Sequence, residues 1–162
     1  MSFQKAKLFW HARNGQRQIC YVPFNDDCEY YVFLKEHHDK GYKQIIITSE
    51  LMSGLMRFFC QEKNLSVYEI DLMEDDEDLD AELNDILQKM ESNRAYFGRL
   101  LDKLHFLSEQ SSIEINRINF KGRHDGKPVR FFIQANGIIG IIPNSFDEIA
   151  RQIKMYLSEE LF

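Results

Sequence analysis

The first pattern of hydrophobic positions is a pair of strand-like runs, residues 7–12 and 18–22. The polar segment between them contains Asn14-Gly15. This pair tolerates the positive φ angles of a two-residue hairpin turn, so the sequence predicts a β-hairpin. Residues 25–27 then offer N-cap and acidic first-turn side chains for a helix that we expect to end before Gly41.

A continuous β-branched run, residues 44–48, begins the next section of the chain. Such a run is typical of a strand that is buried on both faces. An amphipathic segment follows to about residue 63, and a second strand-like segment covers residues 65–70. Strand, helix and strand within this distance predict a βαβ unit with two parallel strands and a right-handed crossover.

Apolar side chains recur at steps of three and four residues after an acidic run at residues 74–85. This heptad pattern predicts a long amphipathic helix over residues 79–107. Ser92-Asn93 and Gly98 favour the alternative, a helical hairpin. The apolar stripe, with one polar member, consists of Leu83, Ile86, Met90, Asn93, Phe97, Leu100, Leu104 and Leu107.

The last third of the chain predicts strands over residues 113–120, 128–134 and 138–142, with a polar turn at 121–127 and a tight turn at Asn136-Gly137. A final amphipathic helix follows, with Ile149, Ile153, Tyr156 and Leu157 on one face.

These elements together predict a mixed α/β (α+β) fold. It comprises an N-terminal β-hairpin and βαβ unit, a central long helix or helical hairpin, and a C-terminal three-stranded antiparallel meander plus helix. We expect a single domain over residues 1–162, with lobes at 1–72, 73–109 and 110–162.

Composition narrows the class of protein. Hydrophobic residues make up 44% of the 162 positions, enough for a folded core. No apolar stretch approaches the roughly 20 residues of a membrane span, and no signal-peptide core follows the N-terminus. Cys20, Cys28 and Cys60 lack the spacing of a disulfide framework or zinc site. We therefore expect a cytoplasmic protein that makes no contact with membranes.

The net charge of −6 is unevenly distributed. Residues 65–109 carry 13 acidic and 4 basic side chains, whereas the flanking thirds are weakly positive. The acidic run lacks the spacing of a calcium-binding EF-hand. Two interpretations remain, a solvated helix start and a docking surface for a basic partner.

No catalytic constellation is complete. The phosphate-binding motifs GxGxxG and GxxxxGK[ST] are absent, as is the nucleophile motif GxSxG. A pair of His11 and Cys20 rests on proximity alone. The C-terminal outline loosely resembles restriction-endonuclease-like enzymes, but its strands lack the carboxylates that hold their metal ion. We expect no catalytic residue, no metal and no cofactor.

Two sets of residues are candidates for ligand contact. Thr48, Ser49, Ser53 and Gly54 follow a predicted strand and begin a helix, where anions can bind, although an ordinary helix cap is the better explanation for them. A basic patch interleaved with aromatic residues could contact nucleic acid. Its members are Arg117, Lys121, Arg123, Lys127 and Arg130.

The leading functional hypothesis is a non-enzymatic accessory or interaction protein that forms a homodimer through the heptad stripe. A polar residue such as Asn93 at a stripe position is known to fix register and oligomeric state. The alternatives are a small-ligand or nucleotide-sensing domain, and a nucleic-acid-binding protein that uses the basic patch.

Overall fold

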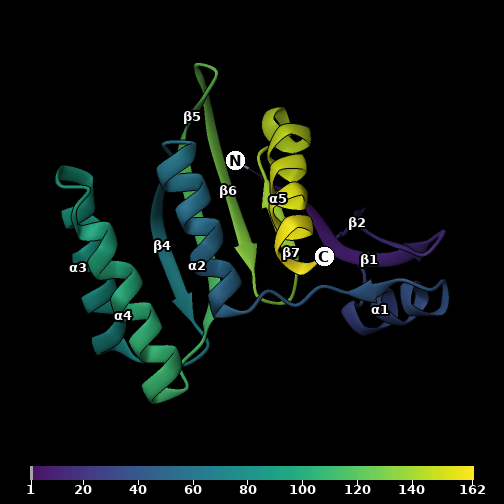
Figure 1. Cartoon of the computed structure of the whole chain (residues 1–162), viewed down its shortest axis with the longest axis horizontal. Helices are drawn as coiled ribbons and strands as arrows, with labels where there is room; N and C mark the ends of the chain where they lie inside the picture. The colour runs from purple at the N-terminus through teal and green to yellow at the C-terminus, as the bar shows by residue number, and fades with distance from the viewer. Residues whose placement is uncertain (1) are drawn as a thin grey trace. The chain divides into compact units, whose positions relative to one another are not determined.

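The computed structural model describes residues 2–162 and confirms the mixed α/β class (Figure 1). The chain forms two compact units. The discontinuous unit consists of the chain up to Ile46 together with Asn136–Phe162, and the inserted unit is Ile47–Ala135. These boundaries differ from those of the three expected lobes.

The discontinuous unit is built around an antiparallel hairpin. Asn14 and Gly15 form its turn with φ angles of 53° and 78°, which confirms the prediction from the sequence. The first half of β1 also pairs with β7, and Phe9 and Trp10 pair with β3. Its elements are β1 (Gln4–Arg13), β2 (Gln16–Pro23), α1 (Tyr30–Asp39), β3 (Lys43–Gln44), β7 (Ile138–Ile141), a 3-10 turn (Pro143–Ser145) and α5 (Phe146–Leu161).

Helices α1 and α5 supply the aromatic contacts of this unit. Tyr21 of β2 meets Phe146 of α5 with ring centroids 5.6 Å apart. Phe9 of β1 meets Phe33 and His37 of α1 at 6.0 and 5.2 Å. Because successive strand residues point to opposite faces, β1 contributes core side chains on both of its faces.

Three predictions about the first half of the chain are wrong. Helix α1 is capped by Glu29, because Asn25 instead accepts a hydrogen bond from the Asp27 N–H in the preceding turn. The run at residues 44–48 is not a strand buried on both faces, since Ile46 is 56% exposed and only Lys43–Gln44 forms a strand. All strand pairs whose register is defined in residues 2–162 are antiparallel, so the predicted parallel βαβ unit is absent.

The inserted unit contains an antiparallel sheet of β4, β5 and β6, with α2 packed on β5 and the α3–α4 hairpin beside β4 (Figure 1). Asp125-Gly126 is the whole β5–β6 turn, so the predicted seven-residue turn is too long. The elements are α2 (Ser49–Arg57), a π-helical turn (Phe58–Glu62), β4 (Ser66–Leu72), α3 (Glu77–Ser92), α4 (Tyr96–Ser111), β5 (Ile115–His124) and β6 (Lys127–Gln134).

The heptad stripe divides between α3 and α4, so the helical hairpin is the alternative that the structure shows. Asn93 is exposed at the turn, where its side chain accepts a hydrogen bond from the Ala95 N–H. Arg94 beside it donates to the carbonyls of Cys60 and Leu65. Ile86 is half-buried, and the other six stripe residues are buried within the chain, which leaves no exposed apolar seam for a partner helix.

A buried lysine joins the two places where the chain leaves and re-enters the discontinuous unit. The Lys7 ammonium is fully buried and donates to the carbonyl oxygens of Ile45 and Asn136. Burial lowers the pKa of Lys7 from 10.5 to about 8. Gly137 has a φ of 83°, and a methyl group there would clash with Ile45 O and Lys7 Nζ. We call these four residues the junction.

Replacing Gly137 with alanine should therefore be far more costly than an equivalent change in an open turn. We expect Gly137→Ala to lower the free energy of unfolding by about 3 kcal/mol or more. Gly126→Ala is the matched control, because Gly126 has a φ of 77° and open space around it. Its cost should be only the backbone strain of about 1–2 kcal/mol. If urea unfolding shows that both variants lose the same free energy of unfolding, the close packing at the junction is contradicted.

The depressed pKa of Lys7 predicts a specific pH dependence. Between pH 8 and 10.5 the unfolded chain holds the Lys7 proton more tightly than the folded chain, so raising the pH stabilises the fold. Over this range, wild type should gain up to about 3 kcal/mol relative to Lys7→Met. Urea unfolding of both proteins at several pH values measures the difference. If the difference in unfolding free energy between the two proteins stays constant with pH, the pKa of Lys7 is not lowered in the folded chain and the prediction is wrong.

Candidate functional site

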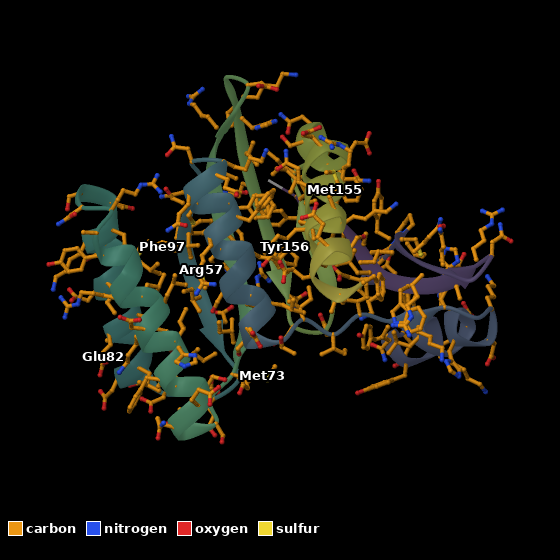
Figure 2. The ribbon with its side chains drawn as sticks, in the orientation of Figure 1. Arg57, Met73, Glu82, Phe97, Met155 and Tyr156 are labelled. Carbon is orange, nitrogen blue, oxygen red and sulfur yellow. The ribbon has the colours of Figure 1, made fainter. Side chains whose placement is uncertain are left out.

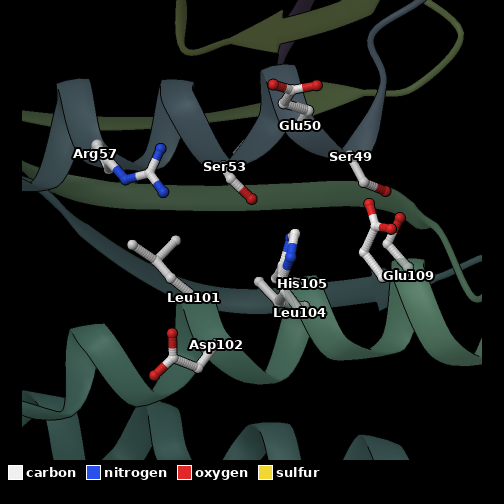
Figure 3. A pocket seen from close by; sticks show the side chains of 10 residues that line it. Ser49, Glu50, Ser53, Arg57, Leu101, Asp102, Leu104, His105 and Glu109 are labelled. Carbon is white, nitrogen blue, oxygen red and sulfur yellow. The ribbon is translucent and has the colours of Figure 1, made fainter.

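A groove of about 500 Å³ lies between α2 and α4 of the inserted unit (Figure 3). This volume is in the range of sites that bind small molecules or side chains. The residues that line the groove are Ser49, Glu50, Ser53 and Arg57 from α2, and Leu101, Asp102, Leu104, His105, Ser108 and Glu109 from α4.

The periodicity of the two helices explains why polar side chains meet in the groove. On α2, Met52, Leu55 and Met56 are buried. Ser49, Ser53 and Arg57 recur every four residues and therefore share a neighbouring face. On α4, Leu100, Leu104 and Leu107 are buried, whereas Asp102, His105 and Glu109 follow at steps of three and four. Packing of the two apolar faces brings the two polar rows opposite each other.

One end of the groove is fixed by a network around the Glu114 carboxylate. Ser108 Oγ donates to its two oxygens at 2.9 and 3.0 Å, and Ser49 Oγ donates to Oε2. Ser49 Oγ also accepts a hydrogen bond of 3.0 Å from the Ile115 N–H. The network joins α2, α4 and β5. The Ser49 hydroxyl is therefore both a donor and an acceptor in this network.

Five charged or titratable side chains of the groove have no partner in the described part of the chain. Within residues 2–162, no ion pair and no side-chain hydrogen bond is made by Glu50, Arg57, Asp102, His105 or Glu109. Arg57 and His105 point into the space between the helices, whereas the Glu50 carboxylate points away from α4 (Figure 3). The neighbouring Lys103 is already paired with Glu82 at 2.8 Å. The residues that line the groove thus include three carboxylates, those of Glu50, Asp102 and Glu109, and one guanidinium.

The structure divides the predicted ligand residues. Ser49 and Ser53 line the groove, whereas Thr48 is an ordinary N-cap that accepts a hydrogen bond from the Leu51 N–H at 3.2 Å. Gly54 lies in α2 but not on the wall of the groove. The α4 residues of the groove were not predicted, because the heptad pattern singles out only the apolar positions of that helix. The polar row beside that stripe, Asp102, His105 and Glu109, was the available signal.

The basic patch has partners within the chain. Arg117 stacks on the Phe132 ring at 3.7 Å and donates to Asn119. Lys121 and Arg130 flank the Tyr68 ring at 5.6 and 5.1 Å, and Lys121 lies 3.7 Å from Glu91. Arg123 donates to Gly126 O in the turn, which Lys127 adjoins. Nucleic-acid binding through this patch stays a prediction.

Cys20 is half-buried and Cys60 buried, and the acidic side chains of residues 2–162 form no metal-binding cluster. Burial raises the pKa of Cys60 to about 11 and also raises that of Cys20, so neither thiol is activated. In the described part of the chain, no three His, Cys, Asp or Glu side chains converge on a metal-binding position. No helix within the same residues is long and apolar enough to cross a membrane.

No protein-family profile matches the chain, and comparisons with curated proteins and with solved structures find no similar protein. The function is therefore argued from the geometry of the groove.

The Ser49 network should matter for stability as well as for the shape of the groove. We expect Ser49→Ala to lower the free energy of unfolding by about 1–2 kcal/mol, because it leaves the buried Ile115 N–H without an acceptor. Ser53→Ala on the same helix is the control, since Ser53 makes no side-chain hydrogen bond within residues 2–162. Its effect should stay within about 0.5 kcal/mol. If urea unfolding gives similar losses of unfolding free energy for the two variants, the Ser49 network does not contribute to stability as predicted.

Proposed function

We propose that this protein is a non-enzymatic binding protein that receives a basic segment of a partner protein in the α2–α4 groove. The supporting observation is that Asp102 and Glu109, which line the groove, make no ion pair and no side-chain hydrogen bond within residues 2–162. A lysine or arginine side chain in the groove would form charge-assisted hydrogen bonds with them.

The distribution of charge supports a basic partner. The inserted unit carries 17 acidic and 11 basic side chains, whereas the discontinuous unit carries nine of each. The whole net charge of −6 therefore lies in the unit that contains the groove. The acidic run begins α3, and Lys103 of α4 pairs with Glu82 of α3. A surface of this sign accelerates the encounter with a basic protein and disfavours acidic ones.

The shape and surroundings of the groove favour a peptide segment over a free cation. Ser49 and Arg57 are eight residues apart on α2, which corresponds to about 12 Å along the helix. Leu101 and Leu104 line the wall and can pack against the aliphatic stem of lysine or arginine. Arg57 lies on the side of α2 that faces the α3–α4 hairpin (Figure 2).

The same observations weigh against two other functions. Within residues 2–162, no hydrogen bond joins Ser49 to His105, so no Ser–His pair supports nucleophilic catalysis in the groove. Self-association through the heptad stripe is not supported, because six of the eight stripe residues are buried within the chain. The three cysteines are free thiols, as is usual in the reducing cytoplasm that we propose for this protein.

Fluorescence anisotropy with a labelled nine-residue peptide of lysine, arginine and leucine tests the proposal. We expect binding at low ionic strength that weakens in 0.5 M salt, because screening shortens the range of charge interactions. Asp102→Asn combined with Glu109→Gln should weaken binding about tenfold or more. The matched control is Glu62→Gln combined with Glu69→Gln, which removes two exposed carboxylates of the same unit outside the groove.

Three results would overturn the proposal. The first is absence of peptide binding at low salt. The second is an equal loss of affinity in the control variant, which would mean that only the overall charge matters. The third is competition by spermine at the same concentration as the peptide, which would show that the groove selects a small cation and not a peptide.

A further inference from the structure

Helices α2 and α4 run in opposite directions along the groove. Ser49 at the start of α2 and Ser108 near the end of α4 both donate to the Glu114 carboxylate, so these two helix ends lie together. The last residue of α2, Arg57, therefore lies at the other end of the groove, beside Leu101 of α4 (Figure 3).

The two ends of the groove carry opposite charges. Glu109 lies at the Ser49 end, next to Ser108 in the chain (Figure 3). Arg57 lies eight residues along α2 from Ser49, which corresponds to about 12 Å at the helical rise. Within residues 2–162, neither Glu109 nor Arg57 makes an ion pair or a side-chain hydrogen bond. Both charges are therefore available to one bound segment.

Asp102 lies toward the Arg57 end of the groove but is not paired with Arg57 within the described residues. The Asp102 carboxylate stays close to α4, whereas the Arg57 side chain points into the space between the helices (Figure 3). A basic side chain of a partner that entered this space would meet the like charge of Arg57. A carboxylate would instead form charge-assisted, paired hydrogen bonds with the guanidinium.

The middle of the groove favours an extended segment over a helix. Ser53 and His105 lie between the two charged ends and face each other across the groove (Figure 3). Within residues 2–162, neither side chain makes a hydrogen bond. An extended segment presents unpaired backbone N–H and carbonyl groups, whereas the backbone of a helix is hydrogen-bonded to itself. Ser53 and His105 can therefore bond the backbone of an extended segment.

We infer that the basic segment of the partner carries an acidic residue four positions from a lysine or arginine, and that Arg57 binds this carboxylate. Residues i and i+4 of an extended chain share a face and lie about 13 Å apart, which matches the separation of the two charged ends. The basic residue lies at Glu109 and the acidic residue at Arg57. This inference rests on the function proposed above and names the class of segment that the groove selects.

The overall charge of the protein predicts the opposite preference. The inserted unit, which contains the groove, carries 17 acidic and 11 basic side chains. If only net charge mattered, a carboxylate added to a basic peptide would weaken its binding. Tighter binding of a peptide with a carboxylate therefore requires a local cation, and Arg57 is the one guanidinium among the residues that line the groove.

Fluorescence anisotropy with two pairs of labelled nine-residue peptides tests the inference. In the first pair, lysines at positions 1 and 3 precede a glutamate or a glutamine at position 7, and threonine and valine fill the other positions. The second pair has the reversed sequences, so that both directions of the bound chain are sampled. We expect the glutamate peptide of one pair to bind at least about fivefold more tightly than its glutamine counterpart.

Arg57→Gln should abolish this preference, so that the glutamate and glutamine peptides bind equally. It should keep or strengthen the binding of the glutamine peptides, because a like charge is removed, and this retained binding also shows that the variant is folded. The matched control is Arg99→Gln, which removes an exposed cation of α4 outside the groove and should keep the preference.

Two results would overturn the role of Arg57 and leave the proposed function intact. One is binding of the glutamine peptides at least as tight as that of both glutamate peptides. The other is a preference for glutamate that survives in Arg57→Gln. If all four peptides fail to bind while the peptide of lysine, arginine and leucine binds, the inference alone is wrong. If that peptide also fails to bind, the proposed function is wrong as well.

Discussion

The burial of the Lys7 ammonium at the junction is the interaction on which the arrangement of the chain depends. This cation has no carboxylate partner and is held by the carbonyl oxygens of Ile45 and Asn136. Those carbonyls belong to the two points where the chain departs for the inserted unit and returns from it. Burial of an ammonium without a counter-ion is costly, and the lowered pKa of Lys7 expresses that cost.

The junction also explains why Gly137 stands at the return point. A side chain there would occupy the space that Ile45 O and Lys7 Nζ use. The Gly137 carbonyl in turn accepts a hydrogen bond of 2.8 Å from the Leu8 N–H, so the same residue aligns β1 with the start of β7. An 89-residue insertion is thus anchored at both of its ends by one strand of the discontinuous unit.

The two units differ in the charge that they present to ligands. The inserted unit holds the entire net negative charge and the groove, whereas the discontinuous unit is neutral. Within residues 2–162, Asp102 and Glu109 of the groove lack partners. This distinguishes the groove from the basic β5–β6 patch, where aromatic and acidic neighbours already engage Arg117, Lys121 and Arg130.

Local signals in the sequence predicted much of the fold. The Asn14-Gly15 turn, the N-terminus of α2 at Thr48 and the buried face of α5 all depend on neighbouring residues, and all were predicted. The parallel βαβ unit was wrong because strand pairing depends on distant residues: β7 takes the first half of the β1 edge and leaves β3 two paired residues.

Asn93 shows a similar limit of the sequence. Its place in the heptad suggested a role in register, whereas its side chain closes a turn between helices. The groove was predicted only in part, because Ser49 and Ser53 follow a recognisable helix start whereas the α4 residues become partners of α2 only by tertiary packing. No feature of the sequence indicated that Lys7 is buried.

The most direct test of the proposed function is a map of amide chemical-shift changes as a basic peptide is titrated into the isotopically labelled protein. The account predicts that the changes concentrate at Ser53, Arg57, Asp102, His105 and Glu109, on the facing sides of α2 and α4. Changes confined to residues outside the inserted unit, or the absence of any saturable change, would contradict the claim that this groove is a binding site for a basic partner.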